Sequence, residues 1–161
     1  MNWIEELKTL IKARYPAIWL VTDEEERIVQ AIREEFYFKP YMSILDKIKR
    51  DGEEIPEEEK LRLIEESGIR KIYEWSAVKG ITEIVEGADE KEIDSAAQDV
   101  YSALGAIINL TQQKQAKSIF VLKDPHEFLR DPLSIRQFKE TYFALKTTYS
   151  SIIIVSPILQ I

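Results

Sequence analysis

Three short apolar runs constrain this chain more than any other feature of its sequence. They cover residues 17–22, 118–122 and 151–157. Runs this short and this apolar are typical of strands buried on both faces, as in parallel sheets. A further stretch, 71–76, alternates between apolar and polar residues and predicts a strand at a sheet edge. Strands that alternate with helices predict a three-layer α/β fold, in which a parallel sheet of about four strands has helices on both faces.

Amphipathic patterns predict helices in most of the chain between these strands. Apolar residues recur three and four positions apart, so each helix has one apolar face to bury. A length of 161 residues suits one domain, and we expect residues 1–161 to form a single α/β unit. The predicted helices cover residues 2–14, 23 to about 36, about 93–113 and 131 to about 145.

Residues 39–68 interrupt the regular alternation and are more polar than the rest of the chain. We interpret them as a helical insertion packed on one side of the domain. Its second helix is predicted to begin at Pro56 and to end at Gly68, since proline suits the first turn of a helix and glycine its C-terminal end. Leu61 and Ile64 are expected to face inward.

The charge balance argues against nucleic acid as a partner. The net charge is −7 and the isoelectric point is near 4.9, whereas nonspecific binding of nucleic acid needs Lys and Arg to neutralise phosphates. No apolar run reaches the roughly 18 residues of a membrane span, and the charged N-terminus does not resemble a signal peptide. The lack of cysteine excludes disulfides and thiolate metal sites. We expect a cytoplasmic protein without a membrane partner.

The residues after the first strand argue against a phosphate-binding loop. A P-loop enzyme has G-x-x-x-x-G-K-[ST] at this position, where backbone amides and the lysine hold the phosphates. Residues 22–27 contain four consecutive carboxylates and neither glycine nor lysine. These carboxylates would repel a triphosphate. Acid–base chemistry by Asp23 and Glu26 is an alternative, but the start of a helix accounts for both acids.

Asp124 is the residue that we single out as a nucleotide-site candidate. It follows the apolar residues 119–122 and Lys123, and this pattern resembles a Walker B strand whose final acid could hold magnesium. The alternative is that Asp124 only caps the turn at Pro125. Ser156, at the end of the last strand, is likewise explained either as a polar sensor residue or as a strand end.

The sole histidine, His126, could be combined with Asp124 and Glu127 into a metal cluster. Three ligands within four residues of a turn seldom converge on one ion, so we predict no metal site. No G-x-S-x-G motif accompanies the histidine, which argues against a serine hydrolase. We predict no catalytic residue and no cofactor for this chain.

Four groups of residues, in order along nearly the whole chain, resemble one known family. They are Arg14, Tyr15 and Pro16 with Thr22 and residues 24–27; Trp75, Ser76 and Gly80; residues 120–124 with His126, Phe128 and Leu129; and residues 156–159. Together they resemble the N-terminal domain of AAA+ ATPases found in cyanobacteria and encoded in some plastid genomes as a conserved open reading frame.

This resemblance implies a degenerate relative of the P-loop NTPase fold. In that family the intact Walker motifs, and with them ATP and magnesium, belong to a second domain, so no catalytic residue is carried onto this chain. The implied partners are the AAA+ domain of the parent chain or other proteins, and the plastid stroma is an implied location. Residues 39–68 are longer than the family's usual link at this place.

Two functions remain at this point. We prefer a noncatalytic regulatory or assembly domain of an AAA+ ATPase, and the alternative is a freestanding NTPase with an unorthodox nucleotide site near Asp124. The family's sheet order places the first strand between the fourth and a fifth strand. Without residues for a fifth strand, residues 17–22 become an edge strand that Pro16 protects only partly. We expect a homodimer through this edge, or its coverage by residues 157–161.

Overall fold

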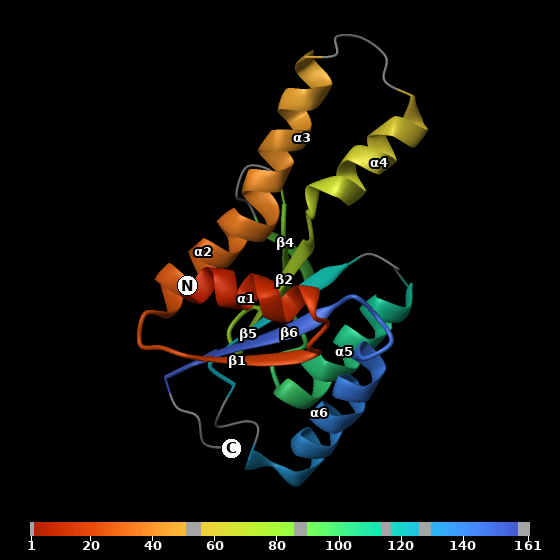
Figure 1. Ribbon diagram of the computed structural model, residues 1–161. Helices are drawn as coiled ribbons and strands as arrows, with labels where there is room; N and C mark the ends of the chain where they lie inside the picture. The colour runs from red at the N-terminus through yellow and green to blue at the C-terminus, as the bar shows by residue number, and fades with distance from the viewer. Residues whose placement is uncertain (1, 51–55, 86–89, 114–116, 126–129, 158–161) are drawn as a thin grey trace.

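The computed structural model describes residues 2–50, 56–85, 90–113, 117–125 and 130–157. It shows one six-stranded sheet with helices on both faces (Figure 1), which confirms the predicted α/β class. The strand order is β1-β6-β5-β2-β3-β4. The strands are β1 (Ala17–Val21), β2 (Lys71–Ser76), β3 (Gly80–Ile84), β4 (Glu90–Asp94), β5 (Ser118–Lys123) and β6 (Ser151–Ser156). The helices are α1 (Trp3–Lys12), α2 (Glu25–Arg33), the π-helix η1 (Glu34–Phe38), α3 (Lys39–Arg50), α4 (Glu57–Ser67), α5 (Val100–Gln113) and α6 (Pro132–Leu145).

The sheet has six strands rather than the predicted four or so. β1, β6, β5 and β2 are parallel neighbours, and β3 and β4 extend the sheet beyond β2 as an antiparallel pair. The prediction that residues 71–76 form a sheet edge is therefore wrong, because β2 lies between β5 and β3. The helix predicted from about residue 93 is shorter than expected, since Ile93 belongs to β4 and α5 begins at Val100.

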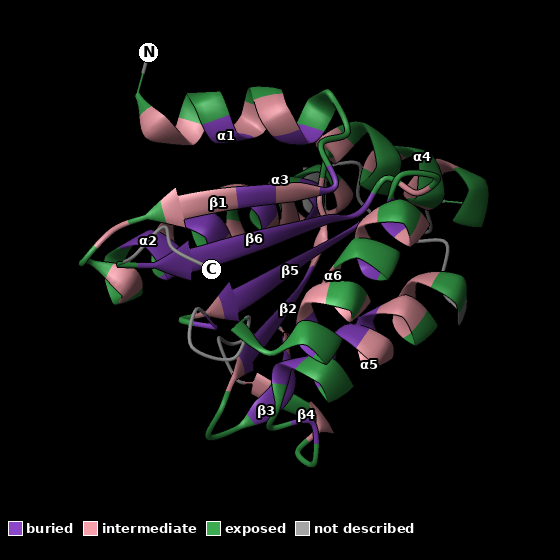
Figure 2. Cartoon of the chain, turned by 90° about the horizontal axis from the view of Figure 1, so that it is seen from below, coloured by how far each residue is buried: buried purple, intermediate pink, exposed green. Residues whose placement is uncertain are grey.

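Apolar side chains form two cores, one on each face of the sheet. Helices α1 and α2 cover one face, and α5 and α6 cover the other (Figures 1 and 2). The central strands β5 and β6 contribute to both cores, which explains their continuous apolar sequences. The α1–α2 core includes Leu7, Ile11, Ile28, Ile32, Val121 and Ile153, and the α5–α6 core includes Trp75, Leu104, Ile107, Phe120 and Ile154.

Residues 25–50 form one uninterrupted helical run through α2, η1 and α3. The π-helical turn ends two residues before Pro40, which has no N–H and cannot donate to the carbonyl of Phe36 four residues earlier. The backbone N–H of Arg70 donates to that carbonyl instead, at 3.0 Å. Arg70 lies between α4 and β2, so this bond joins the returning chain to the long helical run.

The range predicted as a helical insertion contains α3 and α4, which project away from the sheet (Figure 1). Gly68 ends α4 with a left-handed φ of +74°, as its position predicts. The prediction that Leu61 and Ile64 face inward is wrong, because their side chains are 64% and 43% exposed. No residue of α4 is buried, and the helix lies against α3 rather than against the sheet. None of the described helices is long and apolar enough to cross a bilayer.

β1 is an edge strand, as expected for the family's sheet order without a fifth strand, and among the described strands it pairs only with β6. The N–H of Thr22 donates to β6, and the carbonyl of Pro16 accepts from it. Backbone groups alternate in direction along a strand, so those of Ala17, Trp19 and Val21 point to the open edge. Pro16 faces β6 and does not protect this edge, contrary to the prediction. Residues 157–161 were the segment expected to cover this edge, and 158–161 of them lie outside the described residues.

Candidate functional site

A cleft lies between helix α2 and the carboxyl end of strand β5, the side of an open parallel sheet on which ligands bind. We call it the α2 cleft. Its volume is about 360 Å³, and it is the cavity in which a phosphate of a bound nucleotide would be sought in this fold. Its walls are formed by Glu25, Glu26, Val29, Gln30, Arg33 and Lys123.

The turn from β1 into α2 is short and contains no glycine. Only Thr22, Asp23 and Glu24 separate the two elements. The N–H of Glu24 donates to Oγ1 of Thr22 at 3.0 Å, and the carboxylate of Glu24 lies 2.6 Å from Nη2 of Arg27. These contacts close the turn on itself, in place of the open glycine-rich loop that holds phosphate in P-loop enzymes.

The sequence has four consecutive carboxylates after β1, at residues 23–26. Two of them, Glu25 and Glu26, line the α2 cleft. Burial raises the pKa of Glu25; the charge of Lys123 opposes this rise, and the carboxylates of Asp124, Glu26 and Glu74 add to it. A raised carboxyl pKa means that these surroundings disfavour negative charge. The carboxylates of Glu25 and Glu26 on the wall of the cleft would themselves repel an entering phosphate.

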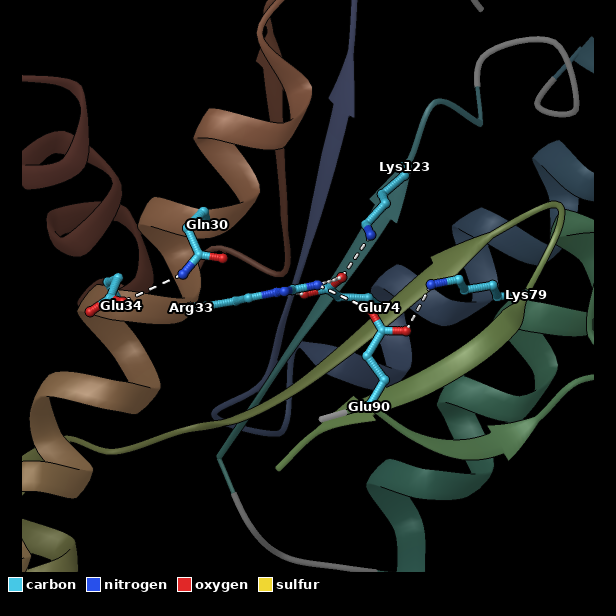
Figure 3. A network of polar contacts seen from close by, with 7 residues as sticks. All are labelled: Gln30, Arg33, Glu34, Glu74, Lys79, Glu90 and Lys123. Carbon is cyan, nitrogen blue, oxygen red and sulfur yellow. Dashed lines mark hydrogen bonds and ion pairs between the residues drawn. The ribbon is translucent and has the colours of Figure 1, made fainter. Parts of the chain in front are cut away.

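The two cations of the cleft bind a buried carboxylate on the neighbouring strand (Figure 3). Glu74, on β2, is only 2% exposed. Arg33 binds it through two parallel hydrogen bonds, from Nε to Oε2 at 2.5 Å and from Nη2 to Oε1 at 2.6 Å. The Nζ of Lys123 lies 2.7 Å from the same Oε1. We call Glu74, Arg33 and Lys123 the Glu74 triad.

The triad continues into the antiparallel part of the sheet. Nη2 of Arg33 also donates to Oε1 of Glu90 on β4 at 3.2 Å, and Lys79 donates to the other oxygen of Glu90 at 3.0 Å (Figure 3). The contacts therefore connect α2, β2, β4 and β5. Such a network explains how an acidic residue can occupy an interior strand, because a buried charge is tolerated when it is paired and hydrogen-bonded.

The triad keeps Glu74 ionised. Burial alone would raise the pKa of Glu74, but the hydrogen bonds from Arg33 and Lys123, together with their charges, outweigh burial and hold the pKa below its usual range. The hydrogen bond to Glu74 raises the pKa of Arg33 in return. Glu74 and Arg33 are therefore charged at neutral pH, and both cations of the cleft already have an anionic partner.

Asp124 lies just beyond β5, is exposed, and is not among the residues that line the α2 cleft. Its φ is +52°, a left-handed conformation that Asp adopts more readily than most residues, and its N–H donates to the carbonyl of Val155 at 2.8 Å. Ser156 is buried at the end of β6. His126 and Glu127 lie outside the described residues. The described part of the chain has no group of three or more side chains suited to hold a metal ion.

Sequence reasoning missed the Glu74 triad. The available signal was an acidic residue between Tyr73 and Trp75 in an otherwise apolar strand. The sequence analysis interpreted that alternation as a sheet edge, where a carboxylate could meet solvent. The partners are not evident from the sequence, because Arg33 lies 41 positions before Glu74.

The comparison with known families gives a match over most of the chain. The matching family is described as SpoVK-like AAA ATPase, N-terminal domain, and the match covers residues 3–38 and 50–161. The chain belongs to this family. The family match leaves out residues 39–49, which correspond to most of helix α3.

Two curated relatives of this SpoVK-like N-terminal domain bear the name "uncharacterized AAA domain-containing protein ycf46". The protein from Trieres chinensis is 29% identical over 161 residues, which is 100% of this chain and 25% of the relative. The protein from Pyropia yezoensis is 26% identical over 156 residues, which is 97% of this chain and 25% of the relative. The chain thus spans about a quarter of the length of these relatives. No solved structure matches it significantly.

Proposed function

We propose that this SpoVK-like N-terminal domain is a noncatalytic regulatory or assembly module of an AAA ATPase. The observation that carries the proposal is that both cations of the α2 cleft are bound to Glu74. A phosphate site needs cations or backbone amides directed at the ligand. The α2 cleft instead has the carboxylates of Glu25 and Glu26 on its wall, where such cations or amides would be needed.

The energetics of the Glu74 triad support this proposal. To bind a phosphate, Arg33 or Lys123 would have to leave Glu74, which is 2% exposed. Removing one partner of a buried ion pair costs about 3–5 kcal/mol, so a phosphate would have to recover that cost before it gained any affinity. The cations therefore serve to hold α2 against the sheet.

The proposed role places ATP and magnesium in another part of the parent protein. The curated relatives are about four times as long as this chain, and their name includes an AAA domain. Their additional length is sufficient for a separate domain that binds ATP and magnesium. The open edge of β1 supports an assembly role, since unpaired strand edges accept a strand from another chain. The partner strand would belong to the parent protein's AAA module or to a second copy, in the cytoplasm or the plastid stroma.

Calorimetric titration of the purified chain with magnesium-ATP and magnesium-GTP tests the proposal. We expect no saturable heat of binding and no hydrolysis. Saturable binding at micromolar to low-millimolar affinity would refute the noncatalytic role. In that event Asp124→Ala, compared with the exposed Asp23→Ala as a control, would show whether Asp124 holds the magnesium, because only the former should abolish binding if it does.

A further inference from the structure

Helix α4 carries an apolar surface that no described part of the chain covers. Leu61 and Ile64 lie three residues apart, on the same side of the helix, and are 64% and 43% exposed. No residue of α4 is buried. Most helices in proteins are stabilised by packing an apolar face against other elements, so an uncovered face of this kind indicates a missing partner.

Most charged residues around this apolar surface are acidic, and Lys60, four residues before Ile64, is a basic neighbour. Glu57, Glu58 and Glu65 lie three or four residues from Leu61 and so share its side of the helix. All three are exposed, and none forms an ion pair with another described residue, whereas Arg62 pairs with other glutamates of α4. We call Leu61, Ile64 and these three glutamates the α4 stripe.

Helix α6 carries a hollow of complementary character on its outer side. The hollow has a volume of about 550 Å³ and is lined by Pro132, Ile135, Arg136, Lys139, Glu140 and Phe143. Phe143 is 63% exposed, and Nζ of Lys146 lies 5.2 Å from the centre of its ring. Lys139 forms no ion pair with another described residue. Arg136 forms an ion pair with Glu140 at 3.5 Å, so Lys139 and Lys146 give the apolar hollow its positive charge among the described residues.

We propose that the α4 stripe of one copy of this chain docks in the α6 hollow of a second copy. Leu61 and Ile64 would cover Phe143, and the glutamates of the stripe would face Lys139 and its neighbouring cations. Two α4 stripes would repel each other through their acids, and so would two α6 hollows through their cations. Charge complementarity therefore favours the mixed contact.

The contact has to form between two copies of the chain. Helices α4 and α6 lie at opposite ends of the molecule (Figure 1), so α4 does not reach the hollow of its own chain. A reciprocal, two-fold symmetric pair would use both stripes and both hollows, whereas a single contact leaves one stripe and one hollow open to further copies. This inference rests on the assembly role proposed above, but its residues are separate from the α2 cleft.

We expect the association to be weak in the isolated domain. Each surface is one face of one helix, which is less than the roughly 800 Å² that each partner buries in a stable interface of standard size. The proposal therefore predicts a mass that rises with protein concentration and falls with added salt, since the acidic and basic groups are exposed. Tethering in a larger protein would raise the effective concentration and strengthen the contact.

Sedimentation velocity over a range of concentrations tests the apolar part of the contact. Leu61→Gln and Phe143→Gln should each weaken self-association by about tenfold or more, because each removes a central apolar anchor. Met42→Gln is the matched control, since Met42 is an apolar residue of α3 with 55% exposure that lies outside both surfaces. Circular dichroism and thermal melting would confirm that the variants are folded.

Charge reversal tests which surfaces meet. Lys139→Glu and Glu65→Lys should each abolish association of the purified variant, because like charges then face each other. An equimolar mixture of the two variants should associate again, since the E65K stripe complements the K139E hollow and the two unaltered surfaces still match. A wild-type chain that stays monomeric at every concentration, or variants that associate like the wild type, would overturn the proposal. Neither result depends on the nucleotide titration.

Discussion

Glu74→Gln should destabilise the domain by about 2–3 kcal/mol at neutral pH. The substitution keeps the size of the side chain but removes the charge that Arg33 and Lys123 bind at 2.5–2.7 Å. Removing one partner of a buried ion pair costs about 3–5 kcal/mol. We expect less here, because the side chains of Arg33 and Lys123 are 17% and 25% exposed and can regain some water. For a domain of this size the melting temperature should fall by about 5–10 °C.

The destabilisation should depend on pH in a defined direction. The pKa of Glu74 is lower in the folded chain than in the unfolded chain. The stabilisation from its charge is therefore complete above the ordinary glutamate pKa of about 4.3 and is lost as the pH falls through the lower, folded-state pKa. The difference in unfolding free energy between wild type and Glu74→Gln should stay constant from neutral pH to about pH 5 and shrink below it.

Urea denaturation followed by circular dichroism, repeated over this pH range, measures the effect. Glu92→Gln is the control, because Glu92 is an exposed glutamate on β4 and its loss should change the unfolding free energy by less than about 0.5 kcal/mol. The reasoning fails if Glu74→Gln unfolds at the same urea concentration as the wild type at neutral pH. It also fails if the difference between them is undiminished in acid, because the charge of Glu74 would then not be its source.

Two further predictions concern stability. The buried indole N–H of Trp19 has no hydrogen-bond acceptor among the described residues, so Trp19→Phe should change the unfolding free energy by less than about 1 kcal/mol. Trp75→Phe, which removes an N–H that donates to Ala97 at 2.6 Å, should cost clearly more in the same denaturation assay, and an equal loss in both variants would contradict this account. Replacing residues 39–68 by a short Gly–Ser link should leave a domain that melts cooperatively with a modest loss of stability, because α4 buries no residue, Ile44 of α3 is buried, and doubling a loop's length costs only about 0.6 kcal/mol. Loss of the cooperative transition would show that the helical pair is integral.

The fold was predictable from the sequence where the signal is local. The apolar runs that became β1, β5 and β6 and the helical periodicities around them are patterns within single elements, and they sufficed for a layered α/β sheet. The hairpin of β3 and β4 was missed because its strands are short and one of them is mostly polar. Glu90 and Glu92 belong to β4, and such residues do not predict a strand.

For the candidate site, the sequence predicted only which kind of ligand it disfavours. The carboxylates at residues 23–26 already argued against a phosphate loop, and Glu25 and Glu26 do line the α2 cleft. The sequence gives no sign that Lys123 points to Glu74, and it drew attention to Asp124 instead. The exposure of Leu61 and Ile64 was equally unpredictable, because a helical stripe looks the same whether it meets a core or solvent.

The sequence by itself determined the strands β1, β5 and β6 and the helices α1, α2 and α6, because hydrophobic periodicity acts over a few residues. It also determined that the first strand leads into acids rather than into a phosphate loop. Only the tertiary structure decided that Glu74 is an interior residue, since the cost of burying a charge depends on partners that the chain brings from far away. Arg33 is 41 positions distant and reaches Glu74 only because α2 packs across the sheet.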